Sequence, residues 1–160
     1  MCSRKNQLNW QIKARERLLN VGHHHLVFSF PESVTQRWLK QPRAVVHELL
    51  QGVRKVIGKL EKQKSLTLGS ILVFQSHCRG LAYKAHVHCV MTAGGLDNED
   101  HWQPLGVLPL EQMTRWLQKA VVCDEGDNGW RIPESRHRSG GESVVQYLGP
   151  RLNGTVVFAK

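Results

Sequence analysis

Hydrophobic residues alternate with polar ones over residues 84–92, and this spacing of two predicts a β-strand with two different faces. One face carries Val87, Cys89 and Met91, and the other carries His86, His88 and Val90. A second β-rich run covers residues 69–77. The segment between the two runs is short and contains Gly80, so we expect the two strands to form a hairpin.

Apolar spacings of three and four predict helices elsewhere. The clearest helix covers residues 43–63, and its apolar side consists of Val45, Val46, Leu49, Leu50, Val53, Val56, Ile57 and Leu60. A second amphipathic helix is predicted over residues 110–122. Shorter helices are predicted over residues 4–19 and 143–148, the latter ended by Gly149-Pro150. Residues 22–31 and 155–158 are predicted strands, whereas residues 96–109 and 124–141 are predicted loops.

The order of these elements, β-α-β-β-α-α-β, predicts an α+β fold with an antiparallel sheet and helices packed on one face, as in ferredoxin-like and RRM-like domains. A chain of 160 residues fits one globular domain with a sizeable core. Within it, residues 1–20 form a basic N-terminal helix that precedes the main body of residues 21–160.

The net charge of +9 favours a polyanionic partner, most simply nucleic acid. A basic surface that serves only solubility is the alternative. The sequence contains no apolar run of membrane-spanning length, no signal peptide and no phosphate-binding G-x-x-x-x-G-K-[ST] loop. Its four cysteines lack C-x-x-C spacing, which indicates reduced thiols and a cytoplasmic protein.

His86 and His88 project side by side from one strand face and form a compact pair of ligands for a divalent metal. The alternative is two polar residues on a wet strand face. A third ligand is needed, and Gln75 on the adjacent predicted strand is our first choice, with His77 on the same face as the alternative. Imidazole ligands alone suit zinc as well as manganese.

Three consecutive histidines occupy positions 23–25. On a strand His24 faces opposite to His23 and His25, so the three cannot bind one ion together. We expect these histidines either to line a DNA-facing sheet surface or to pack laterally.

The His-hydrophobic-His triplet, preceded by a β-rich run and followed by a helix with Tyr147, resembles the HUH family of single-strand DNA endonucleases. More narrowly it resembles the transposases of rolling-circle insertion sequences. Residues 22–31 are similar to the family's first core strand, which ends in F-T-L-P. Residues 86–97 (HVHCVMTAGGLD) are similar to its HLHVLVxxGGLS stretch, and residues 145–148 to the start of its Y-L-A-R-Y motif.

The resemblance implies a metal-dependent endonuclease and transposase that cleaves and rejoins single-stranded DNA. Tyr147 would be the nucleophile and would form a 5′-phosphotyrosine intermediate. The metal would be Mg²⁺ or Mn²⁺, held by His86, His88 and Gln75. Many relatives carry a second tyrosine four residues later, where this chain has Arg151. Either the enzyme uses one tyrosine, or the helix breaks at Gly149-Pro150 and the register differs.

We expect the partner to be single-stranded or hairpin DNA, and a homodimer is one oligomeric state compatible with the sequence. The basic residues chosen as contributors, by charge and placement alone, are Arg54, Lys55, Arg136 and Arg138. Two other functions stay open: a non-catalytic, RRM-like module that binds single-stranded nucleic acid, and a metal-dependent nuclease that uses water while Tyr147 is idle. Covalent capture of DNA separates them.

Overall fold

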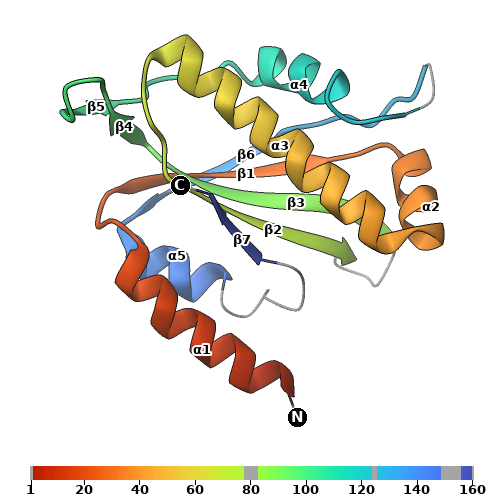
Figure 1. The fold of residues 1–160 in the computed structure, drawn as a ribbon, viewed down its shortest axis with the longest axis horizontal. Helices are drawn as coiled ribbons and strands as arrows, with labels where there is room; N and C mark the ends of the chain where they lie inside the picture. Colours follow the sequence, from red (N-terminus) through yellow and green to blue (C-terminus); the bar gives the residue numbers. More distant parts are fainter. Residues whose placement is uncertain (1, 78–82, 124–125, 149–155, 160) are drawn as a thin grey trace.

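The computed structural model describes residues 2–77, 83–123, 126–148 and 156–159 (Figure 1). The helices are α1 (Cys2–Arg17), α2 (Glu32–Lys40), α3 (Pro42–Lys64), α4 (Leu110–Gln118) and α5 (Gly141–Leu148). The strands are β1 (Gly22–Ser29), β2 (Ser70–His77), β3 (Tyr83–Thr92), β4 (Gly94–Leu96), β5 (Trp102–Pro104), β6 (Glu134–Ser139) and β7 (Val156–Ala159). None of the described helices is long and apolar enough to cross a membrane.

Five strands form one antiparallel sheet in the order β6-β1-β3-β2-β7. Strand β3 lies at its centre, between β1 and β2, so the β2–β3 hairpin predicted from the sequence is confirmed. The order β6-β1-β3-β2, with helices after β1 and β3, is the split βαβ arrangement of ferredoxin-like domains. The predicted α+β class with an antiparallel sheet is therefore confirmed.

The alternation predicted for β3 is also confirmed. Its residues Val87, Cys89 and Met91 are buried in the larger core together with the apolar stripe of α3. Helices α2, α3 and α4 form the layer on this face (Figure 1). Helices α1 and α5 add a second layer on the opposite face, where Val90 belongs to a separate smaller core. The helices thus lie on both faces of the sheet, not only on one.

Four elements were not predicted: α2, β4, β5 and β6. Helix α2 has only Val34 and Thr35 fully buried, so its helical spacing is short and easily missed. In the two-stranded β4–β5 sheet, β4 ends at the first residue of the predicted loop 96–109 and β5 lies within that loop. Strand β6 contradicts the predicted loop 124–141, because its sequence ESRHRS lacks apolar alternation. Pairing with β1 makes it a strand, and this pairing cannot be seen in the local pattern.

Adjacent glycines explain how β4 fits against its neighbours. A Cβ atom on Gly94 would lie 2.5 Å from the carbonyl oxygen of Gln103, and one on Gly95 would lie 2.4 Å from that of Thr67. Both distances are closer than real Cβ contacts. The Gly-Gly pair is therefore required because neighbouring backbone approaches closely, as glycine permits.

The buried face of β3 yields a chemical prediction. Cys89 is fully buried, and this burial raises the pKa of its thiol to about 12. The thiolate is the reactive form, so iodoacetamide at neutral pH is expected to modify Cys89 only after unfolding. Half-buried Cys123 serves as the comparison. Mass spectrometry of alkylated peptides checks this expectation, and native-state labelling of Cys89 as fast as that of Cys123 would contradict it.

Candidate active site

His86 and His88 leave β3 on the face that α1 and α5 cover. Their ring centroids are 5.0 Å apart and the rings are inclined at 67°. The residues are only 9% and 8% exposed, so water reaches them at few points. Their cross-strand neighbours on β1 are Ser29 and Val27. The histidine pair expected from the sequence is thus present as two adjacent, nearly buried imidazoles.

The surroundings of His86 leave one ring nitrogen suited to bind a metal. Its Nδ1 lies 2.9 Å from the carbonyl oxygen of Lys84, to which it donates. The lone pair of the neutral ring is therefore on Nε2. Burial lowers the pKa of His86, and the charge of Lys84 lowers it as well. The hydrogen bond to the Lys84 carbonyl raises this pKa, but burial is the larger effect. A neutral ring fixed through its other nitrogen is the usual state of a metal-ligating histidine.

Gln75 completes a set of three donors. It lies directly opposite His86 in the β2–β3 register, and its Oε1 is 2.9 Å from Nε2 of His88. Octahedral metal–ligand bonds of about 2.1 Å place neighbouring donor atoms roughly 3 Å apart, which this separation matches. No group of three His, Cys, Asp or Glu side chains in the described part of the chain is arranged to hold an ion. The three ligands predicted from the sequence therefore lie side by side, and a metal site formed by them stays a prediction.

The other predicted site residues are less well defined. His77 is the last residue of β2, beyond an irregularity in the register with β3, and its side chain is not described. Its alternative role as third ligand stays a prediction. Arg151 lies outside the described residues.

His25 belongs to this cluster, although the sequence analysis did not place it beside His88. Its Nε2 is 2.9 Å from Nδ1 of His88, and the two rings are stacked with centroids 5.2 Å apart and planes within 6°. His25 and His23 are 1% and 2% exposed, so they do not line an exposed sheet surface. The stacking on His88 confirms the lateral-packing alternative for His25. The spacing of two placed His23 and His25 on one face. Identifying that face as the one with His88 required the pairing of β1 with β3.

Helix α5, which contains Tyr147, lies on the same side of the sheet. Its residues Val144 and Leu148 are buried in the smaller core with Val73 and Val90. Val73 is the direct cross-strand neighbour of His88, and Val90 follows His88 on the same face of β3. The helix backbone is therefore anchored beside the histidine pair. The side chain of Tyr147 itself is not among those described.

An ion pair ties the basic helix α1 to α5. Arg15 donates from Nε to Oε2 of Glu142 at 2.9 Å and from Nη2 to Oε1 at 3.0 Å. This two-bond contact raises the pKa of Arg15 and lowers the pKa of Glu142. Because Glu142 is in the first turn of α5, the contact orients the tyrosine helix relative to α1. It is exposed, so its role is positional more than stabilising.

Two of the basic residues predicted to contact DNA, Arg54 and Lys55, lie away from the histidines. Arg54 and Lys55 are on α3, which covers the opposite face of the sheet (Figure 1). Arg136 and Arg138 are on β6 next to β1, and their side chains are not described. Exposed basic residues on the histidine side occur instead on α1, where Lys13, Arg15 and Arg17 are exposed. The charge of the predicted helix 4–19 was visible in the sequence, but not its position over the histidine face.

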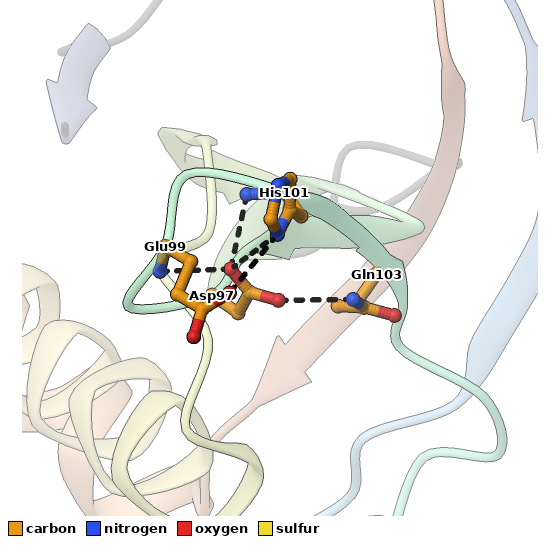
Figure 2. Close-up of polar contacts among 4 residues, drawn as sticks. All are labelled: Asp97, Glu99, His101 and Gln103. Atoms are coloured by element: carbon orange, nitrogen blue, oxygen red, sulfur yellow. Dashed lines mark hydrogen bonds and ion pairs between the residues drawn. The ribbon is translucent and has the colours of Figure 1, made fainter.

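Asp97, at the end of the G-G-L-D stretch, builds a turn. Its carboxylate accepts hydrogen bonds from the backbone N–H groups of Glu99 and His101, at 2.9 and 3.0 Å, and from Nε2 of Gln103 at 2.9 Å (Figure 2). These hydrogen bonds lower the pKa of Asp97, and the bond from Gln103 has the largest effect. The carboxylate therefore closes the connection between β4 and β5, which explains an acidic residue after the glycines in structural terms.

Comparison with known proteins bears on the same region. A family model described as "Putative transposase" matches residues 69–115, which include Gln75, His86 and His88. The transposase for insertion sequence element IS801 of Pseudomonas savastanoi pv. phaseolicola is 25% identical over 94% of this chain and 44% of its own length. The chain is similar to insertion-sequence transposases.

A second relative, named "Putative transposase y4qJ", comes from Sinorhizobium fredii (strain NBRC 101917 / NGR234). It is 24% identical over 99% of this chain and 43% of its own length. The chain thus spans less than half the length of both curated relatives. No solved structure matches it significantly.

Proposed function

We propose that this chain is the DNA-cleaving part of an insertion-sequence transposase, and that it cuts single-stranded DNA through a covalent 5′-phosphotyrosine at Tyr147. One observation carries the proposal: His86, His88 and Gln75 lie on the sheet face over which the tyrosine helix α5 is anchored. The match of a transposase family model to residues 69–115 supports it independently.

In this proposal Nε2 of His86, Nε2 of His88 and Oε1 of Gln75 would hold a Mg²⁺ or Mn²⁺ ion. When bound, the ion acts as a Lewis acid that polarises the scissile phosphate. The Lys84 carbonyl keeps the His86 proton on Nδ1, so Nε2 is available without rearrangement. Burial keeps the ring neutral, which is the form that binds metal.

The phenol oxygen of Tyr147 attacks phosphorus, a Tyr–O–P bond forms, and the bond from phosphorus to the 3′ oxygen breaks. The phenol proton is released, and the departing oxygen takes up a proton to become a 3′-hydroxyl. The energy of the broken ester is kept in the new one, so the strand can be rejoined without a nucleotide cofactor. An unperturbed phenol has a pKa near 10, so a nearby cation is needed to favour phenolate. Arg151 is the proposed second source of that positive charge.

The fold does not favour the alternative function, an RRM-like module that binds single-stranded nucleic acid. Such modules stack bases on exposed aromatic residues of an open sheet face. Here both faces of the central strands are covered: α2, α3 and α4 pack on one, and α1 and α5 pack on the other. The face toward α5 carries buried histidines and valines, which leaves no open aromatic platform on β1 and β3.

The proposal is tested by incubating the chain with a pool of randomised single-stranded and hairpin oligonucleotides, with Mn²⁺ or with EDTA. We expect cleaved strands and a protein-bound strand only when the metal is present. Cleavage without a protein-bound strand would support the water-using nuclease instead. Binding with no cleavage would overturn the proposed chemistry.

DNA binding itself gives a prediction that uses the position of α1. The double variant Lys13→Gln/Arg17→Gln is expected to weaken single-stranded DNA binding and to flatten its salt dependence, by up to about 0.7 in slope for each lost phosphate contact. The matched control Arg54→Gln/Lys55→Gln removes the same charge from the opposite layer. Fluorescence anisotropy at several salt concentrations measures both. A larger effect of the control pair would place the DNA path over α3.

A further inference from the structure

A chain of two hydrogen bonds joins Gln75 on β2, His88 on β3 and His25 on β1 along one face of the sheet. Oε1 of Gln75 is 2.9 Å from Nε2 of His88, and Nδ1 of His88 is 2.9 Å from Nε2 of His25. We infer that His25 is a positioning residue for the metal centre: it selects which nitrogen of His88 faces the ion and holds that ring in place. This inference rests on the proposed metal site.

The metal-free arrangement assigns the protons. An amide oxygen only accepts, so Nε2 of His88 carries the hydrogen and donates it to Gln75. The neutral His88 ring then has its lone pair on Nδ1, which accepts from the Nε2–H of His25. In this state the His88 nitrogen beside Gln75 has no lone pair for a metal.

Metal binding requires the opposite arrangement. Nε2 of His88 must lose its hydrogen, and Nδ1 must carry one and donate it to Nε2 of His25. The proton on Nε2 of His25 passes along the hydrogen bond to Nδ1 of His88. The proton on Nε2 of His88 leaves to solvent, and Nδ1 of His25 takes up one proton from solvent in exchange. No net proton is gained or lost, and both rings stay neutral.

Few side chains can serve both states. The partner of His88 must donate before the ion arrives and accept afterwards, and a neutral imidazole can do each through the same nitrogen by changing tautomer. His25 is 1% exposed and fills the space beside His88, so its ring is the partner of Nδ1. Its ring is also stacked on that of His88, within 6° of parallel, which restricts rotation of the ligand. Second-layer partners of this kind typically change metal affinity by about 10–100-fold when removed.

Three single variants isolate the hydrogen bond. His25→Phe keeps a flat ring against His88 but has no nitrogen. His25→Gln restores a polar end whose amide can turn to donate or accept. His23→Phe makes the same replacement two residues away, at another buried position on the same strand, and is the matched control. His25→Leu repeats the test if the phenylalanine variant does not fold.

The measurements are Mn²⁺ affinity, from electron paramagnetic resonance of free ion, and the His88 tautomer in the Zn²⁺-loaded protein, from ¹⁵N NMR. We expect His25→Phe to bind Mn²⁺ about 10–100-fold more weakly, with His25→Gln and His23→Phe within roughly threefold of the original chain. In the original chain Zn²⁺ should move the His88 proton to Nδ1. The metal-free unfolding temperature of each variant checks that the fold is intact.

Two results overturn the inference alone: unchanged Mn²⁺ affinity in a folded His25→Phe or His25→Leu variant, or equal losses in His25→Phe and His25→Gln. A Zn²⁺-loaded chain whose His88 proton stays on Nε2 would also overturn it. If the original chain itself binds no Mn²⁺, the metal site of the proposed function fails, and the inference fails with it.

Discussion

Replacing both His86 and His88 by alanine is expected to abolish Mn²⁺ binding. The change removes two of the three donors and leaves only the amide oxygen of Gln75, which cannot hold an ion alone. Loss of a second-layer partner costs about 10–100-fold in affinity, so losing two direct ligands should exceed about a hundredfold. Isothermal titration with MnCl₂ measures the change, and DNA cleavage should disappear with it.

The matched control is His101→Ala, an exposed histidine on the β4–β5 connection beside Asp97. It should bind Mn²⁺ as the original chain does. Because His86 and His88 are buried, the single changes His86→Gln and His88→Gln are measured as well, since they preserve more of the packing. Unchanged affinity in a folded double variant would place the metal elsewhere.

Replacing Tyr147 by phenylalanine is expected to abolish the covalent link to DNA while Mn²⁺ and DNA binding persist. The change removes one hydroxyl group, and α5 stays anchored through Val144 and Leu148. Tyr83→Phe is the control. It changes the only other tyrosine of the chain, which is exposed at the start of β3, three residues from His86. An adduct that survives Tyr147→Phe but not Tyr83→Phe would assign the nucleophile to the hairpin.

Much of the central sheet could be predicted because its strands contain their own signal. In β3 the period of two separates Val87, Cys89 and Met91 from the histidines, and burial on both faces keeps that pattern intact. The stripe of α3 is equally clear at a spacing of three and four. The hairpin followed from a short connection between two such strands. These features depend on residues that are close together in the sequence, so the sequence pattern alone reveals them.

Strand β6 and the neighbours of the histidine pair were missed because they depend on distant partners. Strand β6 is polar and becomes a strand by pairing with β1, more than 100 residues earlier in the chain. His25 lies beside His88 because β1 and β3 are neighbours in the sheet, whereas the local pattern only placed it on one of two faces. The same applies to the basic residues. Arg54 and Lys55 were chosen for their charge. Only the packing of the helix layers shows that α3 and the histidines are on opposite sides of the sheet.

The most direct test of the account is to identify the amino acid that becomes attached to DNA. The chain is incubated with labelled single-stranded DNA and Mn²⁺, the adduct is isolated on a denaturing gel, and its peptides are mapped by mass spectrometry. The account predicts one modified peptide, containing Tyr147, with the strand joined through a 5′-phosphate and a free 3′-hydroxyl on the released piece. Attachment to any other residue, or cleaved DNA with no attached peptide, would contradict it.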